Sequence, residues 1–148
     1  MFSDSFEDWY LAYWQQDMQY DWWCSGERAT DGFVSAGVDG GADDATLTLG
    51  AAIDLSAVSD ATLTFSWYIE SGLDSGEYLA CDLWNGATWN EVARLRGNED
   101  PENVWQNEEI DLGGYLTGDF KLRFRGSMSL GSEDAYVDLV RVTAVPLQ

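Results

Sequence analysis

Polar and apolar residues alternate along the middle of the chain, between positions 61 and 95. The first run of this stretch places Leu63, Phe65, Trp67 and Ile69 on one side of an extended backbone, with mainly hydroxyl-bearing residues between them. A repeat of two residues is typical of a strand with one buried face, because successive side chains point to opposite sides of a sheet. The sequence therefore predicts a half-buried strand at the centre of the fold.

Two turn signals divide the rest of this stretch. The polar, glycine-bearing segment Ser71–Gly76 separates the central strand from an apolar run over Tyr78–Leu83. Asn85-Gly86 then precedes a third run over Trp89–Leu95. Asn-Gly between two strand-like runs is a strong hairpin signal, because both residues tolerate the positive φ of a type I′ turn. We therefore expect three consecutive antiparallel strands between residues 61 and 95.

Similar runs, separated by turn residues, occur on both sides of this segment. They predict strands over 33–38, 45–49, 105–112, 119–126 and 133–145. The segment from 9 to 23 fits neither the strand nor the helix period, and a short helical turn within 7–16 is one option. About nine to eleven strands without a long helix predict an all-β fold, a two-sheet antiparallel β-sandwich of jelly-roll type. Residues 1–148 are expected to form a single domain.

The composition is compatible with a folded core and with a soluble chain. Apolar residues make up 45% of the 148 residues and aromatic residues 14%, which argues against disorder. No apolar run approaches the roughly 20 residues that span a bilayer, so membrane insertion is not expected. The N-terminus shows no basic flank followed by an apolar segment, and hence no visible signal peptide.

The charge is strongly negative, with 27 Asp and Glu against 7 Lys and Arg and a net charge of −20. Such a field repels nucleic acids and anionic membranes, so neither is expected as a partner. Most of the carboxylates are interpreted as a solvated surface, as in a salt-adapted or secreted protein. Some could bind a hard cation such as Ca²⁺, which prefers oxygen ligands.

Histidine is absent, which removes the usual general base, the Ser-His-Asp and Cys-His arrangements and nearly every catalytic zinc site. Two cysteines, Cys24 and Cys81, could form one disulfide in an oxidising compartment or could both be buried thiols. Cys81 lies within an apolar strand, which favours a buried thiol there. No reactive-thiol role is supported.

Two further clusters each allow two interpretations. Seven Trp and Tyr residues lie between positions 9 and 23, either as plugs at one end of a sandwich or as a platform on which sugar rings stack. Lys121, Arg123 and Arg125 fall on the outward side of the strand at 119–126. They either balance acidic neighbours in the sheet or bind an acidic ligand.

Ser5-Phe6-Glu7, Trp14–Asp17 and Asp21-Trp22 near the start of the chain, with Tyr136–Val140 near its end, resemble motifs of MAM-type adhesion domains. The opening resembles the family's "FE…W-x-Q…D…D-W" pattern, and the final strand resembles its closing hydrophobic-Asp strand. The same outline occurs in jelly-roll accessory modules of bacterial secreted proteases and polysaccharide-degrading enzymes. The family's disulfides are not reproduced, so the chain looks like a prokaryotic-style relative, and homotypic receptor adhesion does not carry over. The matching motifs are Ser5-Phe6-Glu7, Trp14–Asp17, Asp21-Trp22, Leu63–Tyr68, Trp84-Asn85-Gly86 with Trp89, Trp105, Ile110–Leu112, Leu122–Arg125 and Tyr136–Val140.

The resemblance implies a structural calcium site that joins the two ends of the chain. Glu7 matches the family's "FE" glutamate, Asp21 its "D-W" aspartate and Asp138 the aspartate of the closing strand, while Asp39 lies where a loop ligand is often supplied. Ca²⁺ takes six to eight oxygen ligands, so carboxylates from the first and last strands could hold one ion. The alternative is that these are ordinary polar residues of edge strands.

Three functions are compared. The first is a non-catalytic extracellular or cell-surface module that binds carbohydrate or another surface as part of a larger protein, with Trp23, Trp84, Trp89 and Tyr115 as stacking residues. The second is a structural or protein–protein interaction domain of a secreted protease or adhesin. The third is a glycoside-cleaving enzyme that uses paired carboxylates. Exposure discriminates the first two, because a sugar platform needs solvent-facing aromatic rings.

Overall fold

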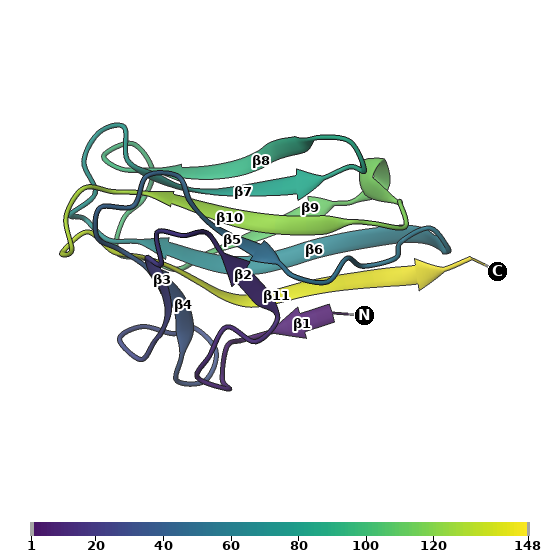
Figure 1. Ribbon diagram of the computed structural model, residues 1–148, viewed down its shortest axis with the longest axis horizontal. Coiled ribbons are helices and arrows are strands. Elements are labelled where there is room, and N and C mark those ends of the chain that lie inside the picture. Colours follow the sequence, from purple (N-terminus) through teal and green to yellow (C-terminus); the bar gives the residue numbers. More distant parts are fainter. Residues whose placement is uncertain (1, 148) are drawn as a thin grey trace.

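The apolar sides of eleven strands face one another between two antiparallel sheets in the computed structural model, which describes residues 2–147 (Figure 1). This arrangement confirms the predicted two-sheet β-sandwich of jelly-roll type. No α-helix occurs in the described part of the chain, and one turn of 3₁₀-helix, η1 (Gly113–Tyr115), precedes β10. Sheet A contains, in spatial order, β3 (Trp22–Ser25), β4 (Ser35–Val38), β11 (Ala135–Pro146), β6 (Val58–Ile69) and β9 (Gln106–Asp111), with β1 (Phe2–Asp4) beside β11. Sheet B contains β2 (Trp14–Gln16), β5 (Ala45–Leu49), β10 (Lys121–Ser127), β7 (Tyr78–Trp84) and β8 (Trp89–Arg96).

The core between the sheets is formed by the apolar side of each alternating strand. Phe65 packs edge-on against Trp67 and against Phe124 of the facing sheet, with ring centroids 4.9 and 5.1 Å apart. Trp67 and Phe124 are fully buried. Aromatic pairs in this geometry add about 0.5–1.5 kcal/mol beyond their area burial. The alternation read from the sequence thus identifies the side of β6 and of β10 that faces the core.

The sequence predicts three consecutive strands that pair in order, and the first of these two pairings is wrong. β6 pairs with β11 and β9 of sheet A, whereas β7 pairs with β10 and β8 of sheet B. The segment between β6 and β7 crosses from one sheet to the other, and its Leu73 is buried. The hairpin between β7 and β8 is confirmed, but its loop has four residues and only Gly86 has positive φ. The Asn85 side chain instead accepts the N–H groups of Ala87 and Thr88.

A bulge explains the irregular apolar pattern of the last strand. The pairing of β11 with β6 shifts register between Asp138 and Arg141, and Leu139 adopts a φ of 53°. The extra residue returns Val140 and Val142 to the core side that Val137 occupies. β11 is therefore one strand whose alternation is interrupted, and its second half pairs with β1 so that the two ends of the chain lie together (Figure 1).

The aromatic segment between residues 9 and 23 divides between core and surface. Trp14 and Trp22 are buried, and the Trp22 indole donates to the carbonyl of Ala45 at 2.9 Å. Trp9, Tyr10 and Tyr20 are more than half exposed. Trp14 and Trp22 therefore fill the core, as one of the two interpretations predicts. The rings of Trp9, Tyr10 and Tyr20 lie at the surface.

The cysteines are free thiols in different sheets, Cys24 on β3 and Cys81 on β7. Cys81 is fully buried, as its place in an apolar strand indicated. Burial raises the pKa of the Cys24 thiol to about 11, with a smaller contribution from Asp4.

Candidate functional site

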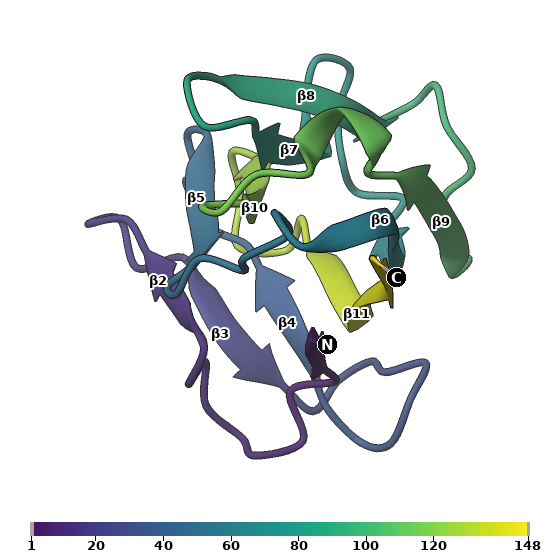
Figure 2. The same ribbon diagram turned by 90° about the vertical axis from the view of Figure 1, so that its right-hand side faces the viewer.

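The loop between β3 and β4, residues 26–34, folds against the outer face of sheet A (Figure 2, lower right). Its Glu27 and Arg28 side chains reach residues of β6 and β11, and its backbone contacts Asp138 of β11. The loop therefore brings a charged pair from the first quarter of the chain onto a sheet built largely from its middle and end.

A row of aromatic side chains crosses this face at one register level. Trp23 lies opposite Gly37, Gly37 opposite Tyr136, and Tyr136 opposite Tyr68. Trp105, next to β9, continues the row, with its ring centroid 5.4 Å from that of Tyr68. The Trp23 ring lies on the backbone of Gly37, because a Cβ there would come within 3.1 Å of it. The two tryptophans at the ends of the row are partly exposed.

Arg28 covers the middle of this row. Its guanidinium carbon lies 4.7 Å from the ring centroid of Tyr68 and 5.9 Å from that of Tyr136, and its Nε is 3.3 Å from Glu70 Oε1. Burial lowers the pKa of Arg28, but the hydrogen bond to Glu70 and the charges of Tyr68, Glu70 and Tyr136 together outweigh it, so the pKa is raised overall. The Arg28 side chain remains 40% exposed, so it can still donate hydrogen bonds to a ligand.

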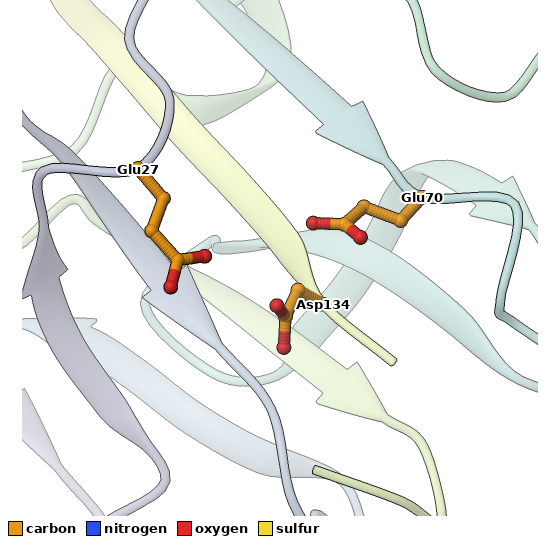
Figure 3. A group of neighbouring side chains, drawn as sticks. All are labelled: Glu27, Glu70 and Asp134. Carbon is orange, nitrogen blue, oxygen red and sulfur yellow. The ribbon is translucent and has the colours of Figure 1, made fainter. Parts of the chain in front are cut away.

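Three carboxylates converge beside Arg28, and Figure 3 shows Glu27, Glu70 and Asp134 pointing toward one another. Each offers an oxygen within 4.8 Å of the others, and the Tyr136 hydroxyl lies 3.0, 2.9 and 3.3 Å from them in that order. A hydroxyl has one proton and can donate to only one carboxylate at a time. The group therefore presents several free acceptor positions, and its spacing would also allow a cation.

The crowding of acids changes their protonation. Burial, then the charges of Glu70, Asp39 and Glu27, raises the pKa of Asp134 to about 6. Burial and the adjacent carboxylates raise the pKa of Tyr136 far above its ordinary value. Both groups are therefore held toward their protonated, hydrogen-bond-donating forms.

A hollow of about 370 Å³ extends this face away from the acids. It is lined mainly by Thr64, Ser66, Asn107 and Glu109, with Leu139 at its edge. Ser66 Oγ and Asn107 Oδ1 are 2.6 Å apart, which fixes the orientation of both side chains. The outer face of sheet A thus combines flat rings, a cation, carboxylates and hydroxyl groups. We name this surface, from Trp23 through Arg28, Tyr136 and Tyr68 to Trp105, the sheet A face.

Two of the predicted metal ligands anchor the 26–34 loop. Glu7 accepts the N–H groups of Phe33 and Val34 at 2.8 and 2.9 Å, and Asp138 accepts those of Thr30 and Asp31 at 3.0 Å each. Asp138 is fully buried, and this burial raises its pKa to about 6 although its amide hydrogen bonds act in the opposite direction. The first segment of the chain and its last strand thus hold the same loop.

The other two predicted ligands lie elsewhere. The Asp39 amide donates to the Asp21 carbonyl at 3.3 Å, where β3 begins and β4 ends. Burial, then the Asp21 charge, raises the pKa of Asp39, which also adjoins Asp134. Among residues 2–147, the groups of three or more carboxylates with metal-like spacing are Glu27–Glu70–Asp134 and Asp74–Glu77–Glu133. The four predicted ligands do not form one such group.

The four predicted stacking residues lie in three places. Trp23 belongs to the sheet A face. Trp84 and Trp89 are cross-strand partners in sheet B, and their ring centroids are 5.5 Å apart. Tyr115 lies in η1 and packs edge-on against buried Phe120. These rings therefore do not form a single platform.

The residues that sequence reasoning missed are those that only the sheet register brings together. Arg28, Glu70 and Asp134 flank strands and have no periodic pattern of their own. One signal was available, because Tyr68 is the one aromatic residue on the hydroxyl-bearing side of β6. Its partners Tyr136 and Trp105 could not be identified without knowing which strands neighbour β6.

Two of the three basic residues of β10 have the simpler of the two predicted roles. Arg123 and Arg125 both bond to Asp82 of β7, whose carboxylate is buried, at 2.7 and 2.6 Å. Arg125 also contacts Asp44 and Glu91. Arg123 and Arg125 therefore balance acidic neighbours in sheet B.

No family model and no curated protein sequence matches this chain. Solved structures with the same fold do match along nearly its whole length. The xylan-binding domain CBM22-1 of Xyn10C from Paenibacillus barcinonensis has a TM-score of 0.70 and 14% identity, with 99% of this chain and 95% of that domain covered. The K1 cleaved adhesin domain of Lys-gingipain from Porphyromonas gingivalis W83 has a TM-score of 0.70 and 19% identity, with 97% of each chain covered.

A third similar structure is TmCBM61 in complex with β-1,4-galactotriose, with a TM-score of 0.67 and 14% identity over 95% of this chain and 94% of that one. At these identities the similarity shows the fold. No long apolar helix of the kind that crosses a membrane is present in residues 2–147.

Proposed function

We propose that this chain is a non-catalytic carbohydrate-binding module of a larger extracellular or cell-surface protein, and that the sheet A face binds the sugar. The observation that carries the proposal is the row of aromatic rings across the outer side of sheet A, beside Arg28 and three carboxylates. Trp23 and Trp105 at its ends are partly exposed, and Tyr68 and Tyr136 between them are buried. Two similar structures are domains named for binding xylan or solved with a galactotriose, and others are cleaved adhesin domains of Lys-gingipain.

The chemistry of this face suits a neutral polysaccharide. The partly exposed rings of Trp23 and Trp105 offer flat apolar surfaces for the C–H faces of sugar rings. Arg28 donates hydrogen bonds, while Glu27 and Glu70 accept them from hydroxyl groups. A uronate chain would meet the repulsion of the acid cluster and of the net charge of −20.

The position of Tyr136 supports binding without cleavage. Glycosidases keep their two carboxyl groups roughly 5–9.5 Å apart so that the scissile bond, and a water molecule in inverting enzymes, fits between them. Here the Tyr136 hydroxyl lies between Glu27 and Glu70, within 3.0 Å of each. The space in which a glycosidic bond would have to sit is already occupied.

The test is binding to xylan and to β-1,4-galactotriose by affinity electrophoresis and isothermal titration calorimetry, after a screen on a glycan array. We expect Trp105→Ala and Arg28→Ala each to weaken binding by about tenfold or more, because Trp105→Ala removes one of the two partly exposed rings and Arg28→Ala removes the cation in the middle of the row. Tyr13→Ala is the control, since Tyr13 is also an aromatic residue at the surface but borders a different hollow beside β2. If Trp105→Ala and Arg28→Ala bind as well as the wild type, the sheet A face is not the site.

We propose further that Ca²⁺ strengthens the anchor of the 26–34 loop. Of the four residues predicted to bind it, Glu7 and Asp138 hold this loop, whereas Asp21 and Asp39 lie where β3 begins and β4 ends. Two carboxylates are hard oxygen ligands of the kind that calcium prefers, and backbone carbonyls or water would complete its six to eight oxygens. Glu7 and Asp138 would hold the ion.

A thermal melt with Ca²⁺ and with EDTA tests the calcium proposal. Binding of an ion to the folded state alone raises the melting temperature by mass action. We expect Glu7→Gln to reduce that rise, and Asp43→Asn, a change at an exposed acid, to leave it intact. A melting temperature that is the same in Ca²⁺ and EDTA would show that Ca²⁺ does not stabilise the fold.

A protein surface is the second candidate partner, favoured by the exposed rings on the N-terminal loops. Trp9, Tyr10 and Phe33 are 60%, 63% and 80% exposed, which is unusual for large apolar side chains. In this case the chain acts as an interaction domain within a protease or adhesin. The array and the sheet A variants separate the alternatives, because protein binding through these loops is insensitive to Trp105→Ala.

A further inference from the structure

The outer face of sheet B carries a second hollow with the same kinds of groups as the sheet A face. Its volume is about 360 Å³, at the lower end of the range of about 300–1,000 Å³ for ligand pockets. Its lining consists of Trp84 and Trp89 from adjacent strands, with Asp119 and Lys121 at the start of β10. It lies on the sheet opposite to Trp23, Arg28 and Trp105.

The two indole rings are held in place from both sides. Trp84 and Trp89 are tilted by 54° to each other, so they form two walls of the hollow rather than a closed stack. The Trp84 indole donates to Asp119 at 3.3 Å. The Arg123 guanidinium, fixed by Asp82 at 2.7 Å, lies 4.4 Å from the Trp89 ring centroid. Little side-chain freedom therefore remains to be lost when a ligand binds.

The charged groups at the edge leave hydrogen-bonding capacity unused. Asp119 is exposed and accepts one indole N–H, so its carboxylate has further lone pairs for hydroxyl groups. Lys121 is the one lysine of the chain and forms no ion pair within residues 2–147, which leaves three ammonium donors. Gly86, in the turn between β7 and β8, lies close to the Asp119 carboxylate, since a Cβ there would come within 3.3 Å of Asp119 Oδ1.

We infer that this hollow, the Trp84–Trp89 hollow, is a second binding site for one pyranose unit of a neutral polysaccharide. The inference rests on the proposed function, because it takes the ligand to be of the same class. Indole faces bind the apolar face of the ring, while Asp119 accepts from and Lys121 donates to its hydroxyl groups. A chain with sites on opposite sheets is bivalent, so it can link two polysaccharide strands or bind one insoluble surface with increased avidity.

Calorimetry with β-1,4-galactotriose and a xylooligosaccharide, using the full chain, tests this inference. We expect a stoichiometry of two for the wild type and of one for both Trp89→Ala and Trp105→Ala, with no binding for the double variant. Trp89→Phe, which keeps an aromatic face, should retain both sites. Far-UV circular dichroism and a thermal melt of each variant verify that it folds.

Long soluble xylan adds a readout that depends on bivalency. The wild type should cross-link it and increase light scattering, whereas each single-site variant should bind without cross-linking. If Trp89→Ala keeps the wild-type stoichiometry and scattering, the Trp84–Trp89 hollow is not a sugar site. If Trp105→Ala changes nothing while Trp89→Ala abolishes binding, the inference stands and the sheet A proposal fails. If neither sugar binds the wild type, both are overturned.

Discussion

Gly32 is a position where the lack of a side chain allows the Glu7 carboxylate to lie against the 26–34 loop. It adopts a φ of +69°, and a Cβ there would lie within 3 Å of every atom of the Glu7 carboxyl group. Only glycine combines this backbone conformation with such close approach at little cost. The Glu7 carboxylate can therefore lie against the loop and accept the amides of Phe33 and Val34.

We predict that Gly32→Ala lowers the free energy of unfolding by about 2–4 kcal/mol, because it adds backbone strain and displaces the Glu7 carboxylate from two amides. Urea denaturation measures the effect. Gly76→Ala is the matched control, since Gly76 has a φ of +91° but no atom near its Cβ position. This substitution therefore lowers the free energy of unfolding through backbone strain alone. In a Glu7→Ala background, Gly32→Ala should lower the free energy of unfolding by no more than Gly76→Ala does. Equal losses in both backgrounds would mean that the Glu7 contact is unimportant.

Asp134 links stability to pH. Its pKa of about 6 in the folded chain lies above the ordinary value of 3.8, so the folded state binds the proton more tightly than the unfolded state. The resulting stability is fully present below about pH 4 and is lost as the pH rises through 6. Asp138, also with a pKa of about 6, acts in the same direction.

We therefore predict that the melting temperature in EDTA rises as the pH is lowered from 7 to 5. Asp134→Asn should raise it at pH 7 by a few degrees, equivalent to about 1 kcal/mol after solvent screening, and should weaken the pH dependence. Asp43→Asn removes the same charge from an exposed site and corrects for the overall reduction in net charge. Identical pH profiles for Asp134→Asn and Asp43→Asn would contradict this explanation.

At the scale of single elements, the outer side of β10 is joined to β7 and β8 by a buried ion-pair network. Asp82 is 1% exposed and meets both Arg123 and Arg125. Burial alone would raise the pKa of Asp82, but the hydrogen bonds from Arg125 and Arg123 lower it below its usual range. The associated stability is present above about pH 4 and is lost as the pH falls through the folded pKa.

Removing the buried acid should leave two arginines without their shared partner. We predict that Asp82→Ala lowers the free energy of unfolding by about 3–5 kcal/mol, the range measured when one member of a buried pair is deleted. Glu91→Ala, which removes a more exposed contact of the same Arg125, should cost about 1 kcal/mol or less. Chemical denaturation of the three proteins compares them, and similar losses for both variants would refute the central role of Asp82.

At the scale of the whole molecule, the net charge of −20 opposes folding through repulsion among the surface carboxylates. Salt screens this repulsion, since the Debye length falls from about 10 Å at 0.1 M to about 3 Å at 1 M. We predict that the melting temperature rises between 0.1 and 1 M NaCl. The Asp82–Arg125 pairs are buried and are screened less than the surface charges. A melting temperature that falls over this range would show that the ion pairs outweigh the repulsion.

The positions of the chain ends bear on the two proposed binding surfaces. Its termini are paired through β1 and β11, so both broad sheet surfaces are left for binding. The sheet A face and the Trp84–Trp89 hollow occupy opposite sheets. A larger protein attached through the adjacent chain ends would thus leave both surfaces accessible.

The sequence by itself determined the fold class and the buried side of β6 and β10. The period-two alternation in β6 and β10 correctly separated core residues from surface residues, and the strands at 45–49 and 119–126 were placed within two residues. This succeeded because alternation is a local property: whether a residue points inward depends on its own strand.

Only the tertiary structure decided which strands are neighbours, and this defines the candidate site. β6 and β7 follow each other in the chain but belong to different sheets, whereas Tyr68, Tyr136 and Trp105 come together from distant segments. Strand pairing depends on contacts between residues far apart in sequence, and local periodicity contains no information about the partner. For the same reason Arg28 could not be placed over Tyr68 until the 26–34 loop was seen to be held by Glu7 and Asp138.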